Sequence, residues 1–195
     1  MSKTLLILDL DETLIYTSKT PLINIEPAFT LSAYHYVYKR PYLEEFLYAC
    51  QQYFELAVWS SAQRNYVNPV VKRVFPQSIP LSFVWSRKRC TFGNLPLHYS
   101  LDNHQALGSS QKPSCWFKKL EKVRKRGYSL RKILIVDNSP EKVFFNSANA
   151  IYINDFQGDV NDVELMLLKK YLYTLHHVEN VQMIEKKDWR NSIST

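Results

Sequence analysis

The sequence predicts an α/β fold, a three-layer, Rossmann-like sandwich around a central parallel sheet. The apolar run Leu5–Leu8 is typical of a strand that is buried on both faces, as strands of parallel sheets usually are. Further apolar runs recur along the chain with helical patterns between them. Strands that alternate with helices imply right-handed crossovers and parallel pairing, so these two observations favour the same architecture.

The expected elements follow one another in a regular order. The predicted strands are Thr4–Leu10, Leu56–Trp59, Phe83–Trp85, Ile133–Val136 and Ala150–Ile153. The predicted helices are roughly Tyr42–Tyr53, Ala62–Phe75, Cys115–Arg126, Ser139–Asn146 and Asn161–Leu175. No internal repeat or low-complexity linker divides the chain, so we expect a single domain over residues 1–195.

Two segments lie outside this alternation. Residues 15–40 contain β-forming residues, including Tyr34–Tyr38, and predict a small β insertion directly after the first strand. Residues 86–114 are rich in Ser, Asn, Gly and Pro and predict a long loop insertion with room for a hairpin. Neither segment is long enough for a full cap domain, so we expect an open site.

Composition narrows the function classes. The chain has 195 residues, a net charge of +7 and three cysteines without a Cys-x-x-Cys spacing. The odd number of cysteines favours a reducing compartment over a disulfide framework, and we expect a cytoplasmic protein, with the nucleus as the alternative for a eukaryotic chain. Acids interrupt the N-terminal apolar run and no run approaches eighteen apolar residues, so neither a secretory signal nor a membrane partner is expected.

Carboxylates follow two of the predicted strands. Asp9 and Asp11 come directly after the first strand, with Thr13 two residues further on, and Asp137-Asn138 follows the strand at Ile133–Val136. Burying a carboxylate is costly unless its charge is compensated. At the carboxyl ends of parallel strands these groups predict an active site. In it, Asp9 is a phosphoryl-accepting nucleophile and Asp11 a general acid and base. Mg²⁺ is expected to be bound by Asp9 together with Asp137. Turn or helix capping by these residues is the alternative.

Hydroxyl and ammonium groups are available to contact a phosphate. Ser60 and Ser61 follow the strand at Leu56–Trp59, although Ser61 is also the better candidate for the N-cap of the next helix. Lys118 and Lys119 begin a basic stretch whose charges are mostly expected to be solvated. One of these two lysines should point into the site.

These elements together resemble the haloacid dehalogenase superfamily of phosphatases, and within it the branch of RNA polymerase C-terminal-domain phosphatases and NLI-interacting-factor-like proteins. The resemblance runs from about residue 4 to residue 175. It is carried by LDLDETL at 8–14, KRPYLEEFL at 39–47, VWSSA at 58–62, SRKRC at 86–90, WFKKL at 116–120 and VDNSP at 136–140. It implies a haloacid-dehalogenase-like fold and a phosphate monoester hydrolase.

The resemblance also implies roles for single residues. Asp9 matches the phosphoryl acceptor, Asp11 the general acid and base, Thr13 the end of the first motif and Lys118 the lysine of the third motif. Ser60 stands where the family usually has threonine, and Lys119 where this branch often has aspartate. The implied Mg²⁺ ligands are Asp9, the backbone carbonyl of Asp11, Asp137 and, through water, Asn138.

The expected substrate is a phosphorylated protein or peptide, because an open site suits a large ligand. A small-molecule phosphatase with the same mechanism, and a non-catalytic scaffold that binds phosphorylated ligands, are the alternatives. No cysteine has an arginine six residues later, which excludes the Cys-x₅-Arg phosphatases. The basic stretch 118–132 lacks an aromatic platform, so nucleic acid is not an expected partner. The sequence does not predict an oligomeric state.

Overall fold

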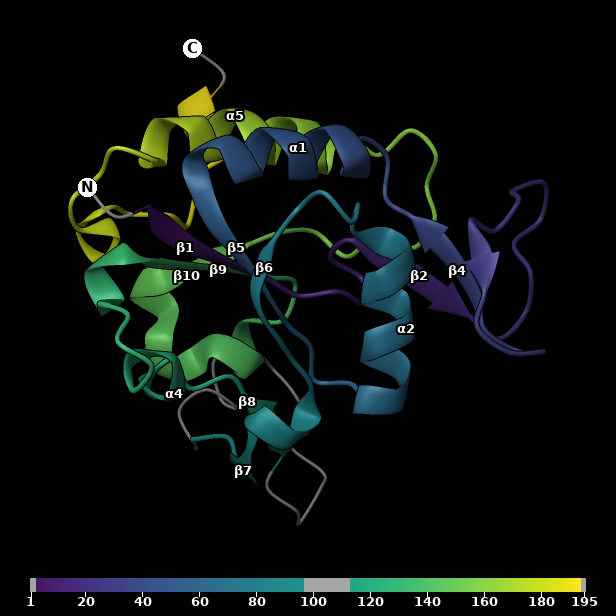
Figure 1. Cartoon of the computed structure of the whole chain (residues 1–195), viewed down its shortest axis with the longest axis horizontal. Helices are drawn as coiled ribbons and strands as arrows, with labels where there is room; N and C mark the ends of the chain where they lie inside the picture. Colours follow the sequence, from purple (N-terminus) through teal and green to yellow (C-terminus); the bar gives the residue numbers. More distant parts are fainter. Residues whose placement is uncertain (1–2, 97–112, 194–195) are drawn as a thin grey trace.

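The computed structural model describes residues 3–96 and 113–193, and its centre is a parallel sheet of five strands (Figure 1). The strands in spatial order are β10 (Ala150–Tyr152), β9 (Ile133–Asp137), β1 (Thr4–Leu8), β5 (Phe54–Trp59) and β6 (Leu81–Trp85). All four pairings are parallel. The predicted parallel α/β sheet is thus confirmed, with β1 in the middle.

The two faces of the sheet explain why β1 is apolar from Leu5 to Leu8. Every residue of β1 is buried, with Leu6 and Leu8 in one hydrophobic cluster and Leu5 and Ile7 in another on the opposite face. Side chains alternate between the faces of a strand, so a strand covered on both sides is apolar at every position. This double burial makes the first polar residue after the strand conspicuous in the sequence.

Helices cover both faces and complete three layers. On one face lie α1 (Leu43–Tyr53), α5 (Glu164–Leu175) and α2 (Arg64–Val74), with α1 and α5 side by side in Figure 1. The other face is covered by the short helix α4 (Glu121–Arg124) and the 3₁₀ segment η3 (Pro140–Asn149), which contribute Val123 and Val143 to the second cluster. The remaining short 3₁₀ turns are Arg87–Arg89, Leu130–Lys132, Val181–Met183 and Asn191–Ile193.

The predicted β insertion is present between β1 and α1. Its strands β2 (Ile15–Ser18), β3 (Phe29–Thr30) and β4 (Tyr36–Lys39) form an antiparallel sheet in the order β2-β4-β3. The predicted strand at Tyr34–Tyr38 corresponds to β4. The described residues of this segment form only this small sheet.

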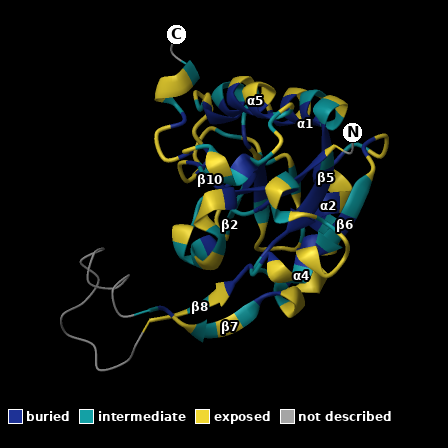
Figure 2. Cartoon of the chain, turned by 90° about the vertical axis from the view of Figure 1, so that its left-hand side faces the viewer, coloured by how far each residue is buried: buried dark blue, intermediate teal, exposed yellow. Residues whose placement is uncertain are grey.

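The predicted helix at Cys115–Arg126 is wrong. Its first part is the strand β8 (Ser114–Phe117), which pairs antiparallel with β7 (Thr91–Asn94), and only α4 is helical. Aromatic side chains favour strands, and Trp116 lies directly opposite Phe92 in this hairpin. Figure 2 shows exposed residues along the hairpin. The rest of the predicted loop insertion, residues 97–112, lies outside the described residues.

One further predicted helix differs from the structure. The helix expected at Ser139–Asn146 is a 3₁₀ segment that extends to Asn149 and is kinked at Asn146. Pro140 occupies its first turn, where a proline costs no hydrogen bond. None of the helices in the described ranges combines the length and the apolarity needed to cross a bilayer.

Candidate active site

The predicted site residues meet at the carboxyl edge of the central sheet. Asp9 follows β1, Ser60 follows β5, and Asp137 is the last residue of β9. Leu8 pairs with Val58 on one side and Val136 on the other, so the three strand ends are in register. The Asp9 N–H donates to the carbonyl of Val136 (3.1 Å), which continues the ladder by one residue.

Lys118 lies between the two buried carboxylates. Its Nζ is 2.8 Å from Oδ1 of Asp9 and 2.6 Å from Oδ2 of Asp137, and all three side chains are at most 2% exposed. Burial alone would lower the pKa of Lys118, but the charges of Asp137 and Asp9 outweigh it and hold that pKa above its usual value. The ammonium is therefore charged and compensates part of the buried negative charge.

The structure also separates the two candidate lysines. The Nζ of Lys119 lies 4.2 Å from the centre of the Phe145 ring, in cation–π geometry outside the carboxylate cluster. Lys118 and Lys119 directly follow β8, and their ammonium groups lie in different surroundings. Lys118 thus faces the site.

Sequence reasoning missed Lys142. Its Nζ lies 3.9 Å from Oδ2 of Asp9, and its side chain is 20% exposed. Burial would lower the pKa of Lys142, but the nearby Asp9 and Asp137 raise it overall. The only available signal was its position five residues after Asp137, at the start of η3.

Asp11 has the environment expected of a proton donor. Burial raises its pKa to about 6, the hydroxyl of Tyr66 opposes the rise, and the charge of Asp9 adds to it. This direction agrees with the requirement that a general acid hold its proton near neutrality. Tyr66 belongs to the first turn of α2 and donates a short hydrogen bond to Oδ1 of Asp11. Sequence reasoning also missed Tyr66, which is 55 residues away along the chain.

Thr13 and Asn138 belong to a hydrogen-bond network beside the carboxylates. The hydroxyl of buried Thr13 lies 3.4 Å from Oδ1 of Asn138. The Asn138 amide nitrogen donates to Glu12 (3.0 Å) and Asp155 (2.9 Å), which orients the amide with its oxygen away from these two acids. Glu12 has a φ of 60°, a left-handed conformation that tightens the turn after β1.

The two serines have different environments. Ser60 is fully buried, and its hydroxyl accepts a hydrogen bond from the N–H of Ala62 (3.0 Å). Ser61 is half-buried, and its carbonyl accepts a hydrogen bond from the guanidinium of Arg87 (2.6 Å). The expected N-cap at Ser61 is not formed, because α2 begins after Gln63 without a side-chain cap. Both serines remain next to the strand end.

The donor atoms fit a small, hard cation. Asp9 is 1% exposed; its Oδ1 lies 2.8 Å from Nζ of Lys118, and its Oδ2 has no hydrogen-bond partner in the described part of the chain. Within those same residues, no group of three acidic, histidine or cysteine side chains converges on one point. Mg²⁺ matches such a set, because it is commonly bound by one or two carboxylates and keeps waters or substrate oxygens for its other positions.

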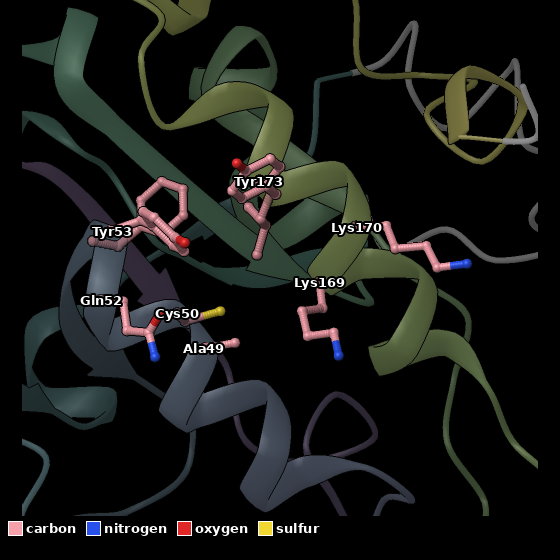
Figure 3. A pocket seen from close by; sticks show the side chains of 9 residues that line it. Ala49, Cys50, Gln52, Tyr53, Lys169, Lys170 and Tyr173 are labelled. Carbon is pink, nitrogen blue, oxygen red and sulfur yellow. The ribbon is translucent and has the colours of Figure 1, made fainter.

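A cavity of about 370 Å³ lies elsewhere, between α1 and α5 (Figure 3). Phe54, the first residue of β5, belongs to its lining, so the cavity lies at the opposite end of that strand from Ser60. Tyr53, Tyr173 and Lys170 border it. It contains none of the residues predicted for the site.

Comparison with known proteins gives the family. The model for the NLI interacting factor-like phosphatases matches residues 4–182, which include both acidic strand ends and Lys118. The chain belongs to this family. Among curated relatives, a probable C-terminal domain small phosphatase of Dictyostelium discoideum is 32% identical over 187 residues, covering 92% of this chain and 53% of the relative.

A second relative agrees with this assignment. The human carboxy-terminal domain RNA polymerase II polypeptide A small phosphatase 2 is 31% identical over 180 residues, which cover 90% of this chain and 58% of that protein. The chain thus spans little more than half of the length of these two relatives.

Solved structures show the same fold at low sequence identity. The structure of Fcp1, an essential RNA polymerase II CTD phosphatase, aligns with a TM-score of 0.52 at 16% identity and covers 98% of this chain and 61% of its own. An uncharacterized protein from Listeria monocytogenes serotype 4b aligns with a TM-score of 0.55 at 15% identity, and the alignment covers 88% of this chain and 98% of that protein. At these identities the likeness concerns the fold alone.

Proposed function

We propose that this chain is a Mg²⁺-dependent phosphatase that hydrolyses phosphate monoesters through an aspartyl-phosphate intermediate. The observation that carries the proposal is the arrangement around Asp9. A buried carboxylate lies beside two ammonium groups, with Nζ of Lys118 2.8 Å from its Oδ1 and Nζ of Lys142 3.9 Å from its Oδ2, at the carboxyl edge of a parallel sheet. Such a group is oriented and partly neutralised, as a nucleophile that attacks a phosphate dianion needs to be.

The reaction has two displacements at phosphorus. In the first, an oxygen of Asp9 bonds to phosphorus and the bond to the leaving oxygen breaks, while Asp11 gives that oxygen its proton. In the second, Asp11 takes a proton from water, whose oxygen attacks phosphorus and breaks the bond to Asp9. Inorganic phosphate leaves, and both carboxyl groups return to their starting states. Lys118 and the hydroxyls of Ser60 and Ser61 contact the phosphate oxygens.

The residues that would hold Mg²⁺ are Asp9, the backbone carbonyl of Asp11, Asp137 and, through a water, Asn138. When bound, the ion supplies positive charge that offsets the repulsion between the carboxylates and a phosphate dianion. Lys118 contributes the same kind of compensation from within the chain, since it contacts both acids directly. Thr13 and Asn138 orient this edge of the sheet through their shared hydrogen bond.

We infer that the substrate is a phosphorylated serine or threonine in a protein or peptide. One curated relative is named a carboxy-terminal domain RNA polymerase II polypeptide A small phosphatase, and another a probable C-terminal domain small phosphatase. The described residues between β1 and α1 form only a small three-stranded sheet, which leaves the site without a full cap on that side. The net charge of +7 favours encounter with phosphorylated, acidic segments.

The test is hydrolysis of p-nitrophenyl phosphate with Mg²⁺, with EDTA, and with the variant Asp9→Asn. We expect turnover that needs Mg²⁺ and is lost in Asp9→Asn. The matched control is Asp159→Asn, which changes an exposed aspartate that accepts a hydrogen bond from the N–H of Asn161, and it should keep full activity. Full activity in Asp9→Asn would refute the nucleophile, and an inert wild type toward aryl and peptide phosphates would refute the enzyme. A panel of phosphoserine and phosphothreonine peptides then tests the substrate class.

A further inference from the structure

Two hydroxyl groups form a chain that ends on Asp11. The Tyr66 hydroxyl in α2 donates to Oδ1 of Asp11, and it lies 2.7 Å from Oγ1 of Thr17 in β2. The three residues come from three separate elements, so their meeting is a product of the fold. Tyr66 is half-buried, and its ring packs against the main hydrophobic cluster, which fixes the position of the hydroxyl.

The direction of each hydrogen bond follows from counting protons. An ionised Asp11 can only accept, and a tyrosine hydroxyl has one proton to give. Tyr66 therefore donates to Asp11, and Thr17 must donate to the Tyr66 oxygen. A tyrosine hydroxyl ordinarily keeps its proton throughout the neutral range, so this donor is always available to Asp11.

This arrangement distinguishes the two oxygens of Asp11. Because Oδ1 already accepts from Tyr66, a protonated Asp11 carries its proton on Oδ2. Within residues 3–96 and 113–193, Oδ2 accepts no hydrogen bond, so this oxygen remains available to a substrate or a water.

We propose that Tyr66 is a positioning residue that holds Oδ1 of Asp11 and thereby selects Oδ2 as the oxygen that exchanges protons in the reaction. This inference rests on the proposed phosphatase function. In the first displacement Oδ2 gives its proton to the leaving oxygen as the bond from that oxygen to phosphorus breaks. In the second, Oδ2 takes a proton from the attacking water. Tyr66 exchanges no proton with the substrate and acts only through Asp11.

A purely structural role for Tyr66 predicts a different result. Loss of packing or of folded protein would lower the rates of all substrates by the same factor. Loss of the positioned acid affects only substrates whose leaving oxygen must be protonated as it departs. The alkoxide of serine needs that proton, whereas a dinitrophenolate leaves without it. The ratio of the two rates therefore reports on Asp11 specifically.

The experiment compares kcat/KM for a phosphoserine peptide and for 2,4-dinitrophenyl phosphate in the wild type and in Tyr66→Phe. General acid catalysis is typically worth about 10²–10⁴ in rate, and we expect Tyr66→Phe to lose about 10²-fold on the peptide. Activity on 2,4-dinitrophenyl phosphate should stay within a small factor of the wild type. The matched control is Tyr48→Phe in α1, whose exposed hydroxyl lies 3.5 Å from that of Ser78, and it should change neither rate.

A second variant removes the outer hydroxyl. Thr17→Val takes away the donor to Tyr66 without altering α2, and it should shift the same ratio in the same direction by a smaller factor. Equal losses on both substrates in Tyr66→Phe, or an unchanged ratio in that variant, would overturn the inference. Wild-type protein that is inert with both substrates would instead refute the proposed function, so the two failures are distinguishable.

Discussion

Arg40 offers the sharpest test of how this fold holds its site. The side chain is fully buried, and its guanidinium forms a bidentate pair with Asp162, from Nε to Oδ1 (2.9 Å) and from Nη2 to Oδ2 (2.8 Å). The remaining nitrogen, Nη1, donates to the carbonyl of Thr13 (3.0 Å). One residue thus connects the β insertion, the segment before α5 and the turn that follows β1. The informative change is Arg40→Met, which keeps much of the volume and removes all three hydrogen bonds.

The loss of stability in Arg40→Met depends on the environment of Asp162, which is left without its partner. Removing one partner of a buried ion pair typically costs about 3–5 kcal/mol, because the other charge stays buried without compensation. Asp162 is 15% exposed and also accepts a hydrogen bond from the N–H of Glu164, so it keeps some solvation. We therefore expect the lower end of this range, a loss of about 3 kcal/mol in the free energy of unfolding. For a chain of this length that corresponds to a drop of roughly 6–12 °C in Tm.

The assay is urea unfolding followed by far-ultraviolet circular dichroism, with the m-value compared between variants. The matched control is Arg124→Met, which breaks an ion pair with Glu121 whose side chains are 57% and 48% exposed. Exposed pairs contribute little to stability, so this control should leave the midpoint unchanged. If Arg40→Met moves the midpoint no more than Arg124→Met at an equal m-value, the reasoning about Arg40 fails.

The other predictions concern the acid, the lysine and a loop. Burial raises the pKa of Asp11 from 3.8 to about 6 when the protein folds. In the presence of EDTA, the folded protein therefore binds this proton more tightly than the unfolded chain does. The free energy of unfolding should therefore fall as pH rises through that window, and Asp11→Asn should reduce the slope and gain up to about 3 kcal/mol at pH 7; an unaltered slope contradicts this. Lys118→Met should abolish turnover, because it leaves the buried carboxylates without their shared ammonium, whereas Lys119→Met should retain turnover in the same assay. Gly158→Ala should lower the free energy of unfolding by about 1–3 kcal/mol in urea titrations. The reason is that φ of Gly158 is +96° and the added Cβ would collide with Leu22. An unchanged free energy of unfolding would show that this loop adjusts freely.

Much of the site is predictable from sequence because its acids lie next to apolar strands along the chain. Asp9 directly follows an apolar strand, Asp137 is the last residue of another, and strands of a parallel sheet end at a common edge. Adjacency along the chain therefore translates into adjacency in space. Asp11 follows the same strand, and burial there raises its pKa to about 6.

The helix predicted at Cys115–Arg126 shows where local patterns are insufficient. Its apolar and basic residues fit a helical period, but Trp116 pairs with Phe92 across a hairpin. That pairing depends on a partner strand more than twenty residues earlier, which a window of neighbouring residues does not contain. The irregular sequence between the two strands concealed the pairing.

The sequence alone determined the α/β architecture and the acids at its strand ends, because burial on both faces leaves a strand no polar positions except where it ends. Only the tertiary structure decided that Lys118, rather than Lys119, lies between Asp9 and Asp137. It also brought Tyr66 to Asp11 from a different helix. The direction of a side chain and the meeting of distant elements depend on how layers pack in three dimensions, and short-range sequence patterns do not contain that information.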